Sequence, residues 1–364
     1  MRKTFSKHAA NDNPKERNSS EPRIFLALQG GGSHGAFEAG VIEALQEADL
    51  LKHVKGISGT SAGAFNAAPL SYALNLGKPE MAPALVNKAW IEIAQSSEAI
   101  SLMHSFARAA STMAPFFMTP TRYPNLPARH VSNLENAGHV AQAYGVISQS
   151  GDIKNRMTKV IPDWDVIKNG EIETIIAATE IQRVGPLKVC AEKLFYNADI
   201  DANAIAASAT LIGTHEKDGA EYKDGGYTNN PPLQDGAKGD YTDIMTIMLS
   251  PRPDAPLQPQ TQAEQVNAKN FLHDEVYNEL ALLTDQGDKF IHVIEMEHEP
   301  HWNETSKMNS EGKWIAELHQ RGYQAGKDWI AKHAKDLGKR TTFDAKSASG
   351  QHYELDNPEY AVAL

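Results

Sequence analysis

The chain has 364 residues, of which 41% are hydrophobic. Because this is enough to form a large apolar core, a chain that is disordered throughout is excluded. Acidic side chains outnumber basic ones by 46 to 35, and the formal net charge of -11 argues against a nucleic-acid partner because phosphates would be repelled. Cys190 is the single cysteine, which excludes an intramolecular disulfide and a cysteine metal cluster.

Residues 1–22 are polar and lack the apolar core of a secretory signal, so we expect a flexible N-terminal tail. No run of the chain reaches the roughly 18 consecutive apolar residues that a membrane-spanning helix needs. We therefore predict a cytoplasmic protein, and we expect any contact with a membrane surface to be peripheral and transient.

The first predicted unit runs from a strand through a glycine loop into a helix. Residues 24–28 are apolar and prone to β structure, and apolar side chains recur at helical spacing over 36–48. Between them lies Gly30-Gly31-Gly32-Ser33-His34-Gly35, where backbone N–H groups can converge on an anion at a helix N-terminus. The expected donors are the amides of Gly30, Gly31, Gly32 and Ser33. The anion could be a bound phosphate or the oxyanion of acyl transfer, and the residues alone leave both open.

The second unit repeats this order, with a short strand over 54–58, a sharp turn over 59–63 and an alanine-rich helix over 64–76. Its turn, Gly59-Thr60-Ser61-Ala62-Gly63, fits the nucleophile-elbow pattern Gly-x-Ser-x-Gly. In that pattern small residues, here Gly59 and Gly63, let a strained strand-to-helix turn expose the serine hydroxyl. Ser61 is therefore the candidate nucleophile.

The glycine loop also satisfies Gly-x-Gly-x-x-Gly, the fingerprint of a dinucleotide site. That interpretation requires an acidic residue at the end of the next strand. The next strand here ends in Ile57-Ser58-Gly59 and leads to Ser61, so the pattern favours the dinucleotide interpretation only weakly.

Residues 96–165 interrupt the alternation with helices, prolines and polar turns, and we predict a helical cap or insertion there. If the segment around Met103 is helical, it presents an apolar stripe that includes Phe106 and Phe117. The stripe either packs onto the domain as a cap or forms an apolar lip, in which Phe106 and Phe117 are the candidate acyl-chain contacts.

Continuous apolar runs predict further buried strands over 172–178, 244–249 and 290–296, with helices over 202–211 and 311–337. Strands that alternate with helices predict an α/β sheet layered with helices. We expect one domain over 23–337 and a loosely ordered C-terminal tail over 338–364.

Asp224-Gly225-Gly226 leads into a turn-rich stretch, and taken alone it is typical of an ordinary surface turn. Together with the two earlier motifs, however, its order and content resemble the patatin-like phospholipase family. That family carries a glycine-rich oxyanion loop, then Gly-x-Ser-x-Gly, then Asp-Gly-Gly or Asp-Gly-Ala. Ala206-Ala207-Ser208-Ala209 before the aspartate and Asn230-Pro231 after it add to the resemblance.

The resemblance implies a three-layer α/β/α sandwich with a mostly parallel sheet and a Ser61–Asp224 catalytic dyad. Gly225 and Gly226 follow the catalytic aspartate. It further implies a hydrolase of phospholipids or other acyl esters. We expect no cofactor, and no metal because the sequence has no ligand cluster with recognisable spacing. His34 is a departure, because many family members carry arginine at this point of the glycine loop.

A serine hydroxyl needs a base, and an unperturbed aspartate is a weak one at neutral pH. The dyad therefore predicts a desolvated Asp224 with a raised pKa. Two alternatives stay open. The first is a Ser-His-Asp triad completed by a later histidine, namely His273, His292, His298, His301, His319, His333 or His352. The second is a catalytically silent module that binds acyl or phosphate groups.

Overall fold

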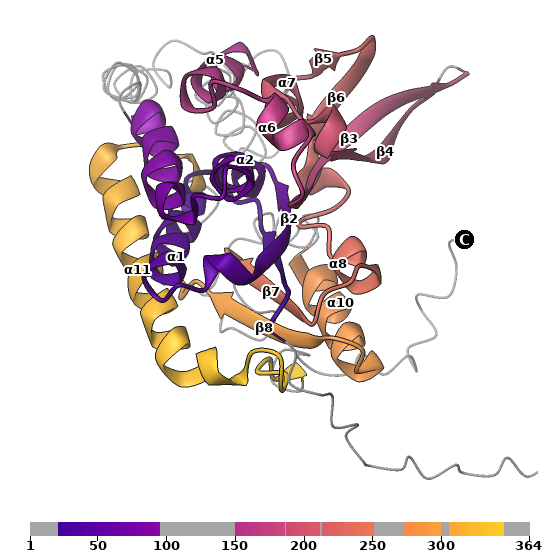
Figure 1. The fold of residues 1–364 in the computed structure, drawn as a ribbon. Coiled ribbons are helices and arrows are strands. Elements are labelled where there is room, and N and C mark those ends of the chain that lie inside the picture. Colours follow the sequence, from indigo (N-terminus) through magenta and orange to yellow (C-terminus); the bar gives the residue numbers. More distant parts are fainter. Residues whose placement is uncertain are drawn as a thin grey trace, which may run out of the picture.

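Within the described residues, eight strands form a central sheet in the middle of the molecule (Figure 1). The structure is a computed structural model that describes residues 21–94, 150–185, 187–211, 213–250, 273–299 and 306–345. The strands are β1 Ile24–Leu28, β2 Val54–Thr60, β3 Glu173–Val184, β4 Leu187–Tyr196, β5 His215–Lys217, β6 Ala220–Asp224, β7 Asp243–Met248 and β8 Phe290–Glu295.

The strand order is β5-β6-β3-β2-β1-β7-β8, and β4 also pairs with β3. Strands β3, β2, β1, β7 and β8 are parallel, whereas β4 and β6 are antiparallel to β3. The β3–β4 and β5–β6 hairpins project from the body of the molecule (Figure 1). The sheet is thus parallel at its centre and antiparallel at one end.

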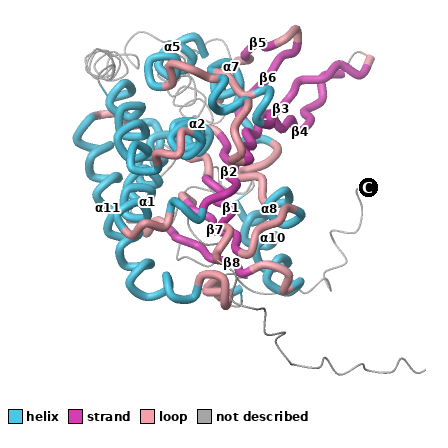
Figure 2. The backbone as a smooth tube through the Cα atoms, viewed as in Figure 1, coloured by secondary structure: helices cyan, strands magenta, loops and turns pink. Residues whose placement is uncertain are grey.

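Helices cover both faces of the sheet, as Figure 2 shows. They are α1 Gly35–Glu47, α2 Ala62–Asn75, α5 Ser150–Val160, α6 Asp165–Lys168, α7 Ala202–Ser208, α8 Gln234–Lys238, α10 His273–Gln286 and α11 Gly312–His333. Alternate residues of β1 point to opposite faces. Leu26 belongs to the core that it shares with α1, α2, α7 and α11, while Phe25 belongs to a second core with α10. The predicted α/β/α sandwich is therefore confirmed.

Helices α1 and α11 lie against each other along much of their length (Figure 1). A Cβ atom on Gly40 would lie 1.9 Å from the backbone oxygen of His319, and one on Gly322 would lie 1.8 Å from that of Phe37. Only glycine permits so close an approach of two helix backbones. The helix that begins at the glycine loop is thus backed directly by the C-terminal helix.

The predicted strands and the two strand–loop–helix units are confirmed. Their bounds agree within two residues, except that β3 runs to Val184, six residues beyond the predicted end. The first part of the predicted C-terminal tail is different, because residues 338–345 pack on the sheet. The amides of Thr342 and Phe343 donate to the carbonyl of Ile291, over 3.0 and 3.1 Å, and Phe343 is buried. Backbone hydrogen bonds and an apolar anchor therefore extend the ordered chain to at least residue 345.

Candidate active site

Ser61 occupies a strained turn between β2 and α2. Its φ of 54° and ψ of -116° place a non-glycine residue at positive φ, a backbone conformation that costs on the order of 1–3 kcal/mol. Gly63 allows the turn because a Cβ there would lie 2.1 Å from the carbonyl oxygen of Leu28, and Gly59 meets the backbone of Gly63 in the same way. Strand β2, the turn and the helix together hold the serine at the carboxyl end of the parallel sheet.

Strand β3 brings Asp224 to this serine. The first part of one β3 edge pairs with β2, up to Ala177 opposite Thr60. From the next residue, Ala178, the same edge pairs with β6, starting with Asp224. The end of β2 and the end of β6 therefore meet along one strand edge, and Ser61 follows directly after the end of β2.

The two side chains are hydrogen-bonded: Ser61 Oγ donates to Asp224 Oδ2 over 2.6 Å. The other carboxylate oxygen, Oδ1, accepts from the amide of Gly226 over 2.8 Å. Asp224 is only 4% exposed, and burial raises its pKa to about 6, against the lowering effect of these two hydrogen bonds. The expectation of a desolvated aspartate with a raised pKa is confirmed, and such a group suits proton transfer near neutral pH.

The backbone of Asp224 is held as firmly as its side chain. Its amide donates to the carbonyl of Thr210 over 2.7 Å, and its carbonyl accepts from Thr179 Oγ1 over 2.9 Å. Gly225 follows at a point where a Cβ would lie 2.3 Å from the carbonyl of Ala177. The Asp-Gly-Gly segment is therefore not an ordinary surface turn but the end of a sheet strand packed on β3.

The glycine loop lies beside this pair, after the end of β1. The amide of Gly30 donates to Asn230 Oδ1, and Asn230 Nδ2 donates back to the carbonyl of Gly30 over 3.2 Å. The N–H of Gly30, one of the expected oxyanion donors, is therefore already bonded to Asn230. Gly31 and Gly32 follow, and Gly32 has a φ of 59°. Among the described residues no acceptor is bonded to the amides of these two glycines, which leaves them as donors for an incoming anion.

Two polar residues that support the site carry little signal as single residues. Ser208 Oγ accepts from the amide of Ser61 over 2.8 Å and donates to the carbonyl of Ala177 over 2.6 Å, so it ties the serine turn to β3. Asn230 ties the glycine loop to the segment after Asp224. Both lie in short motifs that the family resemblance includes, and that context is the only sequence signal for them.

No histidine side chain in the described part of the chain stands between Ser61 and Asp224, because the two are bonded directly. The described candidates have other partners: His292 bonds Asp243, His298 bonds the carbonyl of Leu249, and His319 and His333 pair with Glu43 and Asp336. His301 and His352 lie outside the described residues, as does the side chain of His273. The direct bond favours a dyad over a triad.

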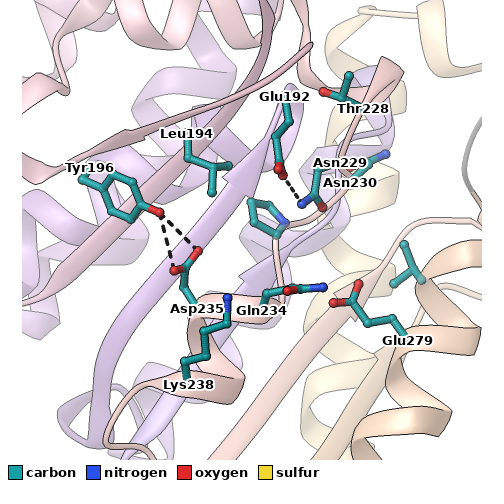
Figure 3. A pocket seen from close by; sticks show the side chains of 12 residues that line it. Glu192, Leu194, Tyr196, Thr228, Asn229, Asn230, Gln234, Asp235, Lys238 and Glu279 are labelled. Carbon is teal, nitrogen blue, oxygen red and sulfur yellow. Dashed lines mark hydrogen bonds between the residues drawn. The ribbon is translucent and has the colours of Figure 1, made fainter. Parts of the chain in front are cut away.

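A cavity of about 320 Å³ is lined in part by the segment that follows Asp224 (Figure 3). In this view Glu192 reaches Asn229, and Tyr196 faces Asp235. Neither Ser61 nor Asp224 lines the cavity, and its carboxylates outnumber its one ammonium group, that of Lys238. Such a lining disfavours a phosphate. The cavity is separate from the dyad because neither dyad residue lines it.

Several predictions concern residues that the structure does not describe. Phe106 and Phe117 both lie within 95–149, outside the described residues, and so does most of the predicted cap. The described end of that region, α5, packs against α7. Among the described helices none is both long and apolar enough to cross a membrane, and the described residues contain no cluster of potential metal ligands.

The fold and this geometry define a class of protein: an α/β sandwich that presents a serine on a strained strand-to-helix turn, bonded to a buried carboxylate. A model of the patatin-like phospholipase family matches residues 26–236, which is more than half of the chain. This protein belongs to the patatin-like phospholipase family. Among curated protein sequences, none matches the chain.

Solved structures with similar folds come from bacteria and from human. VipD of Legionella pneumophila is 12% identical with a TM-score of 0.41, and the match covers 86% of this chain and 68% of VipD. ExoU of Pseudomonas aeruginosa, in complex with SpcU, is 17% identical with a TM-score of 0.37, over 86% of this chain and 52% of that one. Human group IVD cytosolic phospholipase A2 is 10% identical with a TM-score of 0.43, over 87% and 60%. The chain thus spans little more than half of ExoU.

Proposed function

We propose that this protein is a serine acyl-ester hydrolase that releases fatty acid from a phospholipid or related lipid. The observation that carries the proposal is the 2.6 Å hydrogen bond from Ser61 Oγ to a buried Asp224 whose pKa is raised to about 6. Membership of a phospholipase family supports a lipid substrate. The head group and the acyl position are matters for the experiment below.

In the first half-reaction Ser61 Oγ attacks the ester carbonyl carbon while Asp224 Oδ2 takes the hydroxyl proton. The electron pair of the carbonyl moves to its oxygen, and the amides of Gly31 and Gly32 stabilise the resulting oxyanion. The carbon–oxygen bond to the alcohol then breaks, and Asp224 returns its proton to the leaving oxygen. The product is an acyl-Ser61 intermediate and a free alcohol.

In the second half-reaction Asp224 takes a proton from water, and the resulting hydroxide oxygen attacks the acyl carbon. The oxyanion forms in the same place, the bond to Ser61 Oγ breaks, and Asp224 returns the proton to the serine. A fatty acid leaves and the enzyme is restored. Ser33, one of the four expected donors, has its amide in the first turn after Gly32 and would serve as a further donor.

A lipid-panel assay tests the proposal. Fatty-acid release is measured from phosphatidylcholine, phosphatidylglycerol, lysophosphatidylcholine, triacylglycerol and a soluble p-nitrophenyl ester. We expect Ser61→Ala and Asp224→Asn each to lower the rate by at least about 10³-fold, since each removes a member of the reacting pair. The exposed Asp240→Asn serves as the matched carboxylate control and should keep the parent rate.

Labelling with a fluorophosphonate adds an independent readout. The parent protein should be labelled at Ser61, and Ser61→Ala should not be. A catalytically silent module would show neither release nor labelling. Release that survives Ser61→Ala at the parent rate would exclude the proposed dyad.

A further inference from the structure

The glycine loop is contacted by a segment far away in the sequence, the 3-10 turn Ser306–Met308 and the first turn of α11. Ser33 Oγ donates to the carbonyl of Ser306 over 3.0 Å. The indole Nε1 of Trp314 donates to the same Ser33 Oγ over 3.1 Å. One hydroxyl of the loop is thus bonded on two sides by the C-terminal part of the chain.

The next residue of the loop has a partner in the same segment. His34 Nε2 and Ser306 Oγ are 2.9 Å apart, and His34 is only 1% exposed. Its ring lies against those of His298 and Trp314, with centroid separations of 5.8 and 6.1 Å. His34, the departure from the arginine of many family members, is therefore a buried contact residue of the C-terminal segment.

Ordering three successive glycines is costly, because they have no side chains to pack and lose more backbone entropy than other residues. The conformation of the loop therefore depends on contacts from its neighbours. Gly31 and Gly32 supply the proposed oxyanion donors, and Gly32 has a φ of 59°. The nearest side chains after these glycines that can form hydrogen bonds are those of Ser33 and His34. Both are bonded to Ser306, and Ser33 also to Trp314.

We propose that Trp314 and Ser306 are positioning residues of the glycine loop, which keep the amides of Gly31 and Gly32 aimed at the reacting carbonyl. The inference rests on the proposed function. Both residues lie outside the 26–236 stretch that matches the family. They act through Ser33 and His34, the loop residues to which they are bonded.

A double-mutant cycle in the 364-residue chain tests the role of Trp314. Trp314→Phe keeps an aromatic ring and removes the indole donor. We expect about a 10-fold loss of kcat on a soluble p-nitrophenyl ester with KM unchanged, because small displacements of catalytic groups lower the rate this much. Ser33→Ala should cause a similar loss, and Trp314→Phe should add no further loss in the Ser33→Ala background.

The matched control is Trp329→Phe, a buried tryptophan 15 residues further along the same helix. It should lower stability without changing kcat. A second pair of variants probes the histidine contact: Ser306→Ala should lower kcat and slow fluorophosphonate labelling of Ser61, and Ser306→Thr, which keeps a hydroxyl, should restore both.

The outcomes separate the two proposals. If the parent shows no hydrolysis that depends on Ser61, the proposed function falls and this inference falls with it. If the parent is active but Trp314→Phe and Ser306→Ala keep the parent kcat, only the positioning role is overturned. Full additivity of Ser33→Ala and Trp314→Phe also overturns it, because the two residues would then act independently.

Discussion

The backbone amide of Ser61 donates a 2.8 Å hydrogen bond to the hydroxyl of Ser208, although the two residues are 147 positions apart in the sequence. The same hydroxyl donates to the carbonyl of Ala177 on β3. The strained turn at the nucleophile is therefore held by a side chain from α7, and the register of β3 sets where that turn lies.

Replacing Ser208 by alanine should loosen this turn. We expect Ser208→Ala to lower kcat by roughly 10-fold and to cost about 1–3 kcal/mol of unfolding free energy, since a buried amide and a buried carbonyl lose their partner. Esterase kinetics and urea unfolding measure the two effects. Ser71→Ala is the matched control: its buried hydroxyl bonds Thr174 and has no part in the turn, so stability should fall while kcat stays at the parent value.

The pH dependence of activity should follow the ionisation of Asp224. The aspartate must be ionised to accept the serine proton, and burial raises its pKa to about 6. We expect kcat/KM to fall tenfold per pH unit below about pH 6 and to level off above about pH 7. Rates on a soluble ester from pH 4.5 to 8 measure this, with folding checked at each pH. A profile that is flat through pH 6 would contradict the role of Asp224 as the base.

The same carboxylate should destabilise the folded protein at neutral pH. Its pKa is raised from the ordinary 3.8 to about 6, so the folded state holds the proton more tightly than the unfolded state does. Stability is therefore lost as the pH rises through about 6. Asp224→Asn removes the ionisation, and we expect it to raise the unfolding free energy by on the order of 1–3 kcal/mol at pH 8 and by much less at pH 4. Chemical denaturation at both pH values is the measurement.

Gly63 should tolerate no side chain. A Cβ at this position would lie 2.1 Å from the carbonyl oxygen of Leu28, a backbone atom at the end of β1. We expect Gly63→Ala to cost about 3 kcal/mol or more and to abolish ester hydrolysis. In contrast, a Cβ on Gly312 meets nothing closer than 3.8 Å, so Gly312→Ala should change the melting temperature little.

The buried side-chain amide of Asn66 on α2 should matter for stability. Asn66 donates to the carbonyl of Gly35 and to Glu38 Oε2, both over 2.8 Å, and accepts from the indole of Trp90 over 2.8 Å. Burial raises the pKa of Glu38 well above its usual range. Asn66→Ala removes one hydrogen-bond partner from each of three buried groups and should cost about 2–4 kcal/mol by denaturant unfolding. The exposed Asn169→Ala should be close to neutral, and a similar loss there would contradict the buried network as the cause.

Local patterns were enough to predict the parallel half of the fold. Strand β1 and most of β7 are short apolar runs, and the glycines around Ser61 mark the turn between β2 and the helix that follows it. The antiparallel half was not predicted, because charged residues make up most of β6 and interrupt the apolar residues of β4, so neither strand is a continuous apolar run. Their pairing depends on the long β3 edge, which is a non-local property.

The candidate site divides in the same way. Ser61 and the glycine loop were predicted from motifs that are contiguous in the chain. The supports from Ser208, Asn230 and Trp314 are single residues that reach the loops only through folding. The hydrogen bond from the Gly30 amide to Asn230 could not be predicted either, because no local pattern around Gly30 indicates an acceptor 200 residues later in the sequence.

The glycine-mediated contact between α1 and α11 bears on how the protein can be handled as a fragment. The family match ends at residue 236, but β7, β8 and the helix that touches Gly40 all come later. A fragment cut at that point would leave β1 as an open sheet edge and would uncover the apolar side of α1, and both changes promote aggregation. Truncated or chimaeric versions of the protein should therefore retain the chain through residue 345 at least.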